Sequence, residues 1–332
     1  MNLADRINKL VKLGAYILAN GETLQEKIQL AFLNNNWFTK DNIHLMLTNV
    51  ANLYLTEDKL TNWVANYPIQ NTSTKKVALI LAGNIPMVGF HDVLCAYISG
   101  HTTLIKYSDK DEILIPHLLD VLDDPSKFEK VERLENFDAI IATGSNNSAR
   151  YFHAYFSKYP HIIRKNRNGV AVITGEETKE DLLALGLDIF TYFGLGCRSV
   201  AKIYVPENYN FDFLMETLDH RKELIQHNKY KNNFDYNYAL FLLNKDNFYY
   251  NCCLIVKEDT SLFSRISSLH FEYYKDEISL NRLLEKVKEN IQCVVSKKKI
   301  EGFACFDFGE AQTPALDNYA DGVDTMSFLN AL

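Results

Sequence analysis

Apolar side chains recur at helical spacing through the first fifth of the chain. Leu3, Ile7 and Leu10 lie three or four residues apart, and the pattern continues over 26–33 and 42–55. Such spacing places apolar side chains along one face of a helix. The stretch 62–68 closes at Pro68, which stops a helix. The sequence therefore predicts a helical section over residues 1–66, with no chemistry of its own.

The pattern changes after a polar connector at 71–76, where short apolar runs replace the helical spacing. The runs at 77–82, 102–108 and 138–143 predict buried parallel strands. Each run ends in glycine or polar residues and leads into a helical stretch, at 87–99, 111–123 and 149–155. Three strand–turn–helix units in series predict a doubly wound α/β domain with right-handed crossovers.

A second, smaller α/β region follows. Strands are predicted at 169–174, 200–205, 252–256 and 292–296, and helices after 175–181 and over 211–225, 237–243 and 279–289. An apolar run at 323–329 predicts a final strand that can pair with a partner's sheet edge, which favours a homodimer. We expect domain boundaries near residues 167 and 307.

Charge and composition exclude several classes of protein. The formal net charge of −7 argues against nucleic-acid binding. No 18-residue apolar run occurs, so we expect no membrane span, and the charged N-terminus is unlike a secretory signal. The six cysteines have no Cys-x-x-Cys spacing, and the nine histidines form no ligand cluster. We expect a cytoplasmic protein with reduced thiols and no metal.

Polar residues and glycines follow three of the predicted strands. They are Asn84, Lys106 with Ser108 and Asp109, and the pair Gly144–Ser145. Ligands of doubly wound sheets bind at the carboxyl ends of strands, so these residues predict nucleotide binding. Gly144–Ser145 at a helix start can present N–H groups to a pyrophosphate. The alternatives are a plain turn and cap, and a solvated lysine. No Gly-x-Gly-x-x-Gly occurs, which excludes an ordinary Rossmann fingerprint.

An aromatic stretch at 188–200 narrows to Gly194-Leu-Gly-Cys-Arg198. The two glycines indicate backbone that turns sharply or lies close to another group. Arg198 beside Cys197 favours a thiolate, because a neighbouring cation stabilises charged sulfur. The functional interpretation is a nucleophilic Cys197 on a loop between a helix and a strand. The alternative is a buried structural cysteine.

These motifs occur in an order that resembles the aldehyde dehydrogenase superfamily. The four segments are Ala82-Gly-Asn-Ile-Pro86, Lys106-Tyr-Ser-Asp109, Thr143-Gly-Ser145 and Gly194-Leu-Gly-Cys197. The chain resembles the LuxC-type acyl-CoA reductase family more closely, over 81–92, 159–167 and 192–200. The likeness is dense from 77 to 205 and resumes over 308–329.

The resemblance implies an aldehyde dehydrogenase-like fold. It has N-terminal helices and a nucleotide-binding domain at 1–167, a smaller α/β thiol domain at 168–307, and a tail at 308–332 with a candidate oligomerisation strand. It implies NAD(P)H-dependent reduction of an acyl thioester to an aldehyde, through an acyl group on Cys197. The acyl donor is acyl-CoA, a carrier protein or an acyl-transferring partner enzyme.

The resemblance also implies the roles of individual residues. The Asn84 amide and the Cys197 backbone N–H donate to the oxyanion. Lys106 and Ser108 hold the adenosine ribose with Asp109 nearby, and Gly144 and Ser145 hold the pyrophosphate. The family implies NADPH, whereas Asp109 would repel a 2′-phosphate and leaves NADH open.

Two other functions stay open at this stage. Hydrolytic members of the superfamily carry a glutamate that activates water, but the comparable strand at 170–175 is apolar. This argues against oxidation of aldehydes to free acids, although Glu176 and Glu177 follow directly. The second alternative is a catalytically silent acyl-binding scaffold, favoured by the short second domain.

Overall fold

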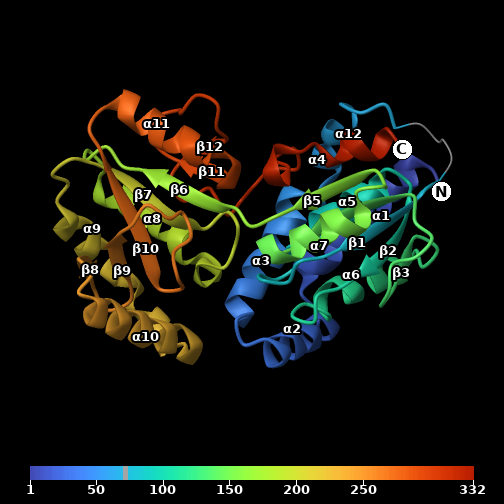
Figure 1. Cartoon of the computed structure of the whole chain (residues 1–332). Coiled ribbons are helices and arrows are strands. Elements are labelled where there is room, and N and C mark those ends of the chain that lie inside the picture. Colours follow the sequence, from blue (N-terminus) through green and yellow to red (C-terminus); the bar gives the residue numbers. More distant parts are fainter. Residues whose placement is uncertain (70–73) are drawn as a thin grey trace. The chain divides into compact units, whose positions relative to one another are not determined.

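A computed structural model describes residues 1–69 and 74–332. It divides into two compact units. Unit 1 comprises Met1–Asn166 and Thr313–Leu332, and unit 2 comprises Arg167–Gln312 (Figure 1). Residues 71–73 of the predicted polar connector lie outside the described residues.

The helices and strands of each unit have the following bounds. Unit 1 contains α1 (Leu3–Ala19), α2 (Glu22–Asn34), α3 (Lys40–Leu53), α4 (Glu57–Val64), β1 (Lys76–Ile80), α5 (Phe90–Ile98), β2 (Thr102–Lys106), α6 (Leu114–Leu122), β3 (Phe128–Lys130), β4 (Ala139–Thr143), α7 (Asn146–Phe156), β5 (His161–Arg164) and α12 (Thr325–Asn330). Unit 2 contains β6 (Asn168–Val172), α8 (Lys179–Phe190), β7 (Val200–Pro206), α9 (Phe211–Leu218), α10 (Asn228–Asn244), β8 (Phe248–Tyr250), β9 (Ile255–Glu258), β10 (Ser268–Tyr274), α11 (Glu277–Val287), β11 (Ile291–Val295) and β12 (Cys305–Phe306).

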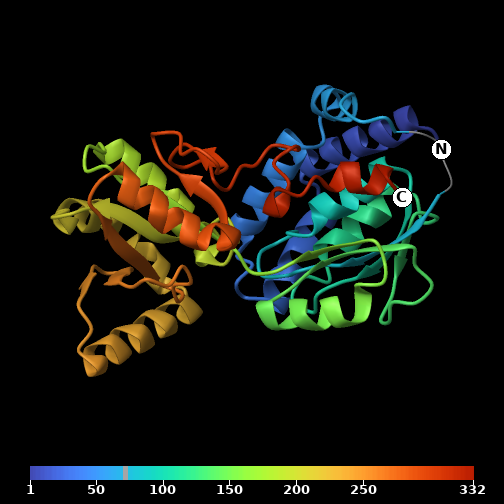
Figure 2. The same ribbon diagram turned by 45° about the horizontal axis from the view of Figure 1, so that its top comes forward.

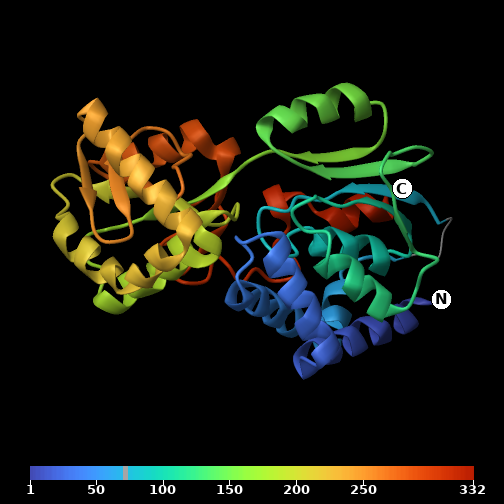
Figure 3. The ribbon, with the colours of Figure 1, turned by 90° about the horizontal axis from the view of Figure 1, so that it is seen from below.

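Unit 1 is built on a parallel sheet with the order β3-β2-β1-β4-β5. Successive side chains of β1 point to opposite faces. Val77 and Leu79 pack with α1, α5 and α6, whereas Ala78 packs with the aromatic side chains of Phe152 and Phe156 on α7. α7 lies along β5 (Figure 3). The predicted doubly wound architecture is confirmed.

The predicted N-terminal helical section is also confirmed, as α1 to α4, but the predicted final strand at 323–329 is wrong. That segment forms α12, which packs beside α5 (Figure 2). The Asp324 side chain accepts from the Ser327 N–H and caps the helix, and Met326 and Leu329 are buried three residues apart. A homodimer built by pairing this strand therefore loses its basis.

A buried ion pair fixes α12 to the sheet. Arg164 at the end of β5 donates to Asp92 of α5 at 2.6 Å and to the Thr325 hydroxyl at 2.9 Å. Both members of the pair are buried. Asp92 and Arg164 lie within the segments 81–92 and 159–167, and their contacts here are structural.

Unit 2 has a seven-stranded sheet with the order β12-β11-β6-β7-β10-β9-β8, parallel except for the antiparallel edge strand β8. Val170 and Val172 face a core shared with Leu280 and Leu284 of α11. α8 packs on β7 and α9. The predicted tail at 308–332 is divided, because its first residues to Gln312 belong to unit 2 and the rest to unit 1.

Candidate functional site

In unit 1, Asn84 lies on the loop that follows β1. The parallel ladder continues one residue past the strand, where the Leu81 N–H donates to the Lys106 carbonyl at 3.1 Å. The chain then turns through Gly83 and Asn84, and the Asn84 side chain is half-buried. β1 lies between β2 and β4, where the direction of sheet winding reverses. Ligands of open α/β sheets bind at this switch point.

The turn after β2 brings Ser108 against the Asn84 loop. A Cβ atom added to Gly83 would lie 2.5 Å from Ser108 Oγ and 2.7 Å from its Cβ. Only glycine allows the two loops to approach so closely. Lys106 is exposed and its Nζ donates to the Glu132 carbonyl at 3.1 Å. Ser108 and Asn84 are therefore on adjacent loops, as the sequence predicts.

Helix α2 anchors the turn that carries Ser108 and Asp109. The side-chain amides of Asn34 and Asn35 donate to the carbonyls of Asp109 and Lys110, both at 3.3 Å. The N-terminal helical section thus positions a predicted ligand-binding turn. Sequence reasoning missed this role, because contacts across 75 residues leave no local pattern.

Gly144 and Ser145 join the end of β4 to α7. The Ser148 N–H donates to Ser145 Oγ at 3.1 Å, so Ser145 caps the helix. A Cβ on Gly144 would lie 2.8 Å from Ser148 Cβ, so the backbone lies close to the first helical turn. A capped helix start beside the switch point fits a pyrophosphate.

In unit 2, the loop before Cys197 has an unusual backbone. Tyr192, Phe193 and Gly194 have φ values of 54°, 57° and 72°. Two consecutive aromatic residues in the left-handed region are strained, and such strain persists where the surroundings fix it. The Phe193 ring packs against His227 with centroids 4.5 Å apart. The loop thus holds Cys197 half-exposed at the amino end of β7.

The other side of the Cys197 loop is held by strand β6. The Gly169 N–H donates to the Ser199 carbonyl at 3.0 Å, and a Cβ on Gly169 would lie 2.5 Å from the Arg198 carbonyl oxygen. The Arg198 guanidinium lies over the Phe306 ring, 5.1 Å from its centroid. Sequence reasoning missed Gly169, which appears in the chain only as the start of a strand.

Cys293 on β11 is also close to this loop, and its sulfur lies 3.9 Å from the Arg198 carbonyl oxygen. It is fully buried, and burial raises the pKa of its thiol to about 12, although Arg198 acts in the opposite direction. A thiol with so high a pKa is not a nucleophile at neutral pH. Cys197 is the more accessible of the two.

A buried carboxyl group near the end of α8 binds the backbone of a segment distant in sequence. Asp188, near the end of α8, is fully buried and accepts from the N–H groups of Gly309 and Ala311 at 2.6 and 3.0 Å. Burial raises the pKa of Asp188 to about 6, against the two hydrogen bonds. In the sequence, Asp188 stands out as a single acidic residue within an apolar run, but the sequence does not identify its partners Gly309 and Ala311.

Comparisons with solved structures identify the fold. Aldehyde dehydrogenase 21 from Physcomitrella patens, in complex with succinate, superposes with a TM-score of 0.71 at 12% identity, over 100% of this chain and 84% of that one. An NAD-dependent aldehyde dehydrogenase from Sinorhizobium meliloti gives 0.67 at 15% identity, over 91% and 71% of the two chains. One from Bartonella henselae gives 0.67 at 10% identity, over 90% and 75%. The chain has the aldehyde dehydrogenase fold.

No protein-family model matches the sequence, and no curated protein matches it. None of these three neighbours is named an acyl-CoA reductase, so the LuxC-type resemblance stays a prediction. The aldehyde dehydrogenase fold nevertheless accounts for the two α/β units and for the strand-end loops that carry the candidate residues.

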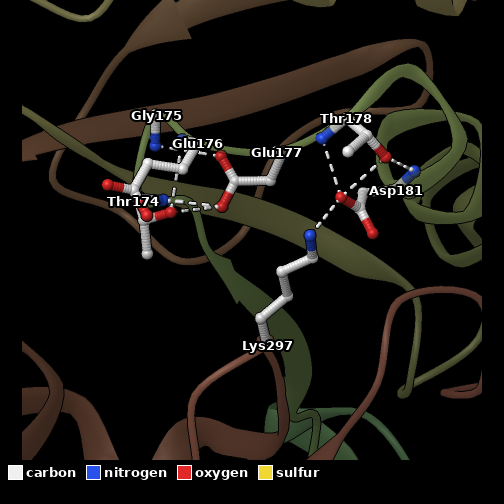
Figure 4. A network of polar contacts seen from close by, with 7 residues as sticks. All are labelled: Thr174, Gly175, Glu176, Glu177, Thr178, Asp181 and Lys297. Carbon is white, nitrogen blue, oxygen red and sulfur yellow. Dashed lines mark hydrogen bonds and ion pairs between the residues drawn. The ribbon is translucent and has the colours of Figure 1, made fainter.

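Within this aldehyde dehydrogenase fold, the Glu177 carboxylate is hydrogen-bonded to the turn that precedes it (Figure 4). Its carboxylate accepts from the Thr174 N–H and hydroxyl, both at 2.8 Å, and from the Gly175 N–H at 2.9 Å. Asp181 caps α8 and pairs with Lys297. Glu177 therefore stabilises the turn that follows β6.

Glu176 and Glu177 are also distant from Cys197. They precede the start of α8, whereas Cys197 follows its end. The 12 residues of α8 span roughly 18 Å at about 1.5 Å each. Neither glutamate is placed to activate a water molecule at Cys197.

Within 1–69 and 74–332, no group of three His, Cys, Asp or Glu side chains could hold a metal ion. No helix in the part of the chain that the structure describes is long and apolar enough to span a membrane.

Proposed function

We propose that this chain reduces an acyl thioester to an aldehyde with NAD(P)H, and that Cys197 carries the acyl group. The observation that carries the proposal is the loop at 192–197, where a strained backbone holds a half-exposed thiol at the amino end of β7. Proteins with this fold that are named aldehyde dehydrogenases support oxidoreductase chemistry at an aldehyde.

In the first step, the Cys197 thiolate attacks the thioester carbonyl of the donor. A new bond forms between Cys197 Sγ and the acyl carbon, and the bond from that carbon to the carrier sulfur breaks. The carrier leaves as a thiolate and takes up a proton from solvent. The resemblance to the aldehyde dehydrogenase superfamily implies that the Asn84 amide and the Cys197 N–H donate to the oxyanion, and the loss of one such donor typically costs about 10²–10³ in rate.

The residues at the switch point of unit 1 fit a nicotinamide dinucleotide. A capped helix start at Gly144–Ser145 suits the pyrophosphate, and Lys106 and Ser108 suit the adenosine ribose. When bound, the cofactor supplies the hydride that converts the acyl group to aldehyde. Asp109 is exposed on the same turn and disfavours a 2′-phosphate, so both NADPH and NADH are tested.

The position of Glu177 favours reduction over the hydrolytic alternative. Its carboxylate accepts three hydrogen bonds within its own turn and lies at the far end of α8. Without a base for water, an acyl group on Cys197 persists long enough for hydride or thiol transfer. The scaffold alternative does not explain why the Cys197 loop holds its thiol half-exposed on a strained backbone.

The experiment is a panel of acyl-CoA esters of graded chain length, assayed with NADPH and with NADH. We expect cofactor oxidation and one equivalent of released CoA for each aldehyde formed. Acid formation from aldehydes with NAD(P)⁺ and without CoA would favour the hydrolytic alternative. The absence of both reactions and of an acyl adduct would favour the scaffold. A carrier protein or partner enzyme that supplies the acyl group is tested in the same assay.

A further inference from the structure

Asp111 is a buried carboxyl group that the proposed reaction does not use. It lies between β2 and α6, and only 4% of its surface is exposed. Its Oδ2 accepts from the Met87 N–H at 2.7 Å, and its Oδ1 is buried without a hydrogen-bond partner. Burial of a carboxyl group with a single hydrogen bond costs stability, which makes Asp111 a candidate for a functional role.

Its one partner, Met87, ends the loop that carries Asn84. Met87 has a φ of 55°, a conformation that side chains other than glycine rarely adopt. Its carbonyl accepts from the Phe90 N–H at 2.9 Å and so begins the turn into α5. The hydrogen bond from Met87 to Asp111 therefore fixes a strained residue at the C-terminal end of the Asn84 loop.

The turn at 108–111, which contains Asp111, also contacts the N-terminal end of the Asn84 loop. Gly83 approaches Ser108 so closely that a Cβ would lie 2.5 Å from its Oγ. Ser108 and Asp111 are joined in turn, because the Asp111 N–H donates to the Ser108 carbonyl at 2.9 Å. Asn84 thus lies on a loop that the 108–111 turn contacts at both ends, through Gly83 and through Met87.

We propose that Asp111 is a positioning residue for the oxyanion donor: its buried carboxyl holds Met87 and thereby sets the orientation of the Asn84 amide. This inference rests on the proposed function, in which Asn84 donates to the oxyanion. Asp111 does not touch the reacting atoms. It acts through the Asn84 loop. The 108–111 turn that carries Asp111 is itself anchored by hydrogen bonds from the Asn34 and Asn35 side chains.

The test compares Asp111→Ala, Asp111→Asn and Glu112→Ala. Glu112 is the neighbouring carboxylate, exposed in a surface ion pair with Lys130 at 3.8 Å, and serves as the matched control. The first readout is the rate at which acyl-CoA acylates Cys197 without cofactor, measured by rapid quench and intact mass. The second is hydrogen exchange of the Met87 amide.

We expect Asp111→Ala to slow acylation about 10- to 100-fold, since a displacement of about 1 Å at a reacting group costs roughly 10². The Met87 amide should exchange faster in this variant. Asp111→Asn keeps a carbonyl acceptor and should acylate within about threefold of the unmodified protein, as should Glu112→Ala. A purely structural role would leave the acylation rate of folded Asp111→Ala protein unchanged.

Acylation by Asp111→Ala at the unmodified rate would overturn the inference. If Asp111→Ala does not fold, exchange in Asp111→Asn decides: a protected Met87 amide supports the inference, and an unprotected one overturns it. If the unmodified protein forms no adduct, the proposed function fails. The exchange measurement still tests the contact between Asp111 and Met87 on its own.

Discussion

Gly169→Ala is expected to damage the Cys197 loop from the opposite strand. The Cβ of alanine would lie 2.5 Å from the Arg198 carbonyl oxygen and 3.1 Å from the Ser199 carbonyl oxygen. Neither neighbour is the end of a flexible side chain, so the backbone itself must move. Gly169 also donates to the Ser199 carbonyl in the sheet, which leaves the strand little room to shift.

The size of the effect follows from this contact. Relief of the 2.5 Å contact to 3.0 Å requires a movement of at least about 0.5 Å. Overpacking of this kind costs about 1–3 kcal/mol of stability. The moved carbonyl belongs to the residue directly after Cys197. Since about 1 Å of misplacement costs about 10² in rate, we expect acylation of Cys197 to fall about 10- to 100-fold.

The assay is single-turnover acylation by acyl-CoA, with thermal unfolding recorded in parallel. Gly21→Ala is the matched control, because a Cβ there meets no atom within 4 Å. It should leave the acylation rate unchanged within error. Because Gly21 is the N-cap of α2, where alanine is less favourable, the melting temperature should fall only slightly. Unmodified acylation by a folded Gly169→Ala protein would refute the claim that β6 sets the position of the Cys197 loop.

Three further predictions concern groups outside the reacting centre. Asp92→Ala leaves the buried Arg164 charge without its partner and should lower the free energy of unfolding in urea by about 3–5 kcal/mol. The control Glu285→Ala, which removes a surface ion pair with Lys288, should lower it by under about 0.5 kcal/mol. Equal losses in the two variants would contradict this prediction. Burial raises the pKa of Asp111 from 3.8 to about 7. Its contribution to stability is therefore full below pH 3.8 and is lost as the pH rises through about 7. Relative to the unmodified protein, Asp111→Asn should gain up to ~4 kcal/mol of unfolding free energy between pH 4 and 8. A difference between the two proteins that does not change with pH would refute this prediction. Glu177→Gln cannot accept all three hydrogen bonds and should lose about 1–2 kcal/mol, while chromatography should show an unchanged ratio of aldehyde to acid; a fall in acid alone would identify Glu177 as a base.

Local patterns were sufficient for the parts of the fold whose contacts repeat along the chain. The helices of the first 66 residues bury one face each, and β1, β2 and β4 are buried on both faces, so both leave a clear apolar pattern. The strand-end residues Asn84 and Ser108 followed from the same pattern, because parallel strands bring their ends to one edge.

Strand β10 was not predicted, because polar residues interrupt its apolar pattern and one of them pairs with a distant strand. Glu272 pairs with Lys202 at 2.6 Å, and His270 contacts the Ser261 carbonyl at 2.9 Å. In the sequence these residues look like an exposed connection. The final helix was mistaken for a strand for a related reason, since its cap at Asp324 outweighs the β-like apolar run.

The positioning groups of the site were also beyond sequence reasoning. Asp188 binds backbone more than 100 residues away, and Gly169 is constrained by a carbonyl on another strand. Each is a single residue of common type without a motif. Their roles depend on the sheet order, which brings β6 against β7 and the 309–311 segment against α8.

The most direct test of the account is peptide mapping by mass spectrometry after incubation with acyl-CoA alone. We predict one acyl group on Cys197, released as aldehyde when NADPH or NADH is added, and no adduct in Cys197→Ala. Modification of another cysteine with full turnover by Cys197→Ala would contradict the central claim.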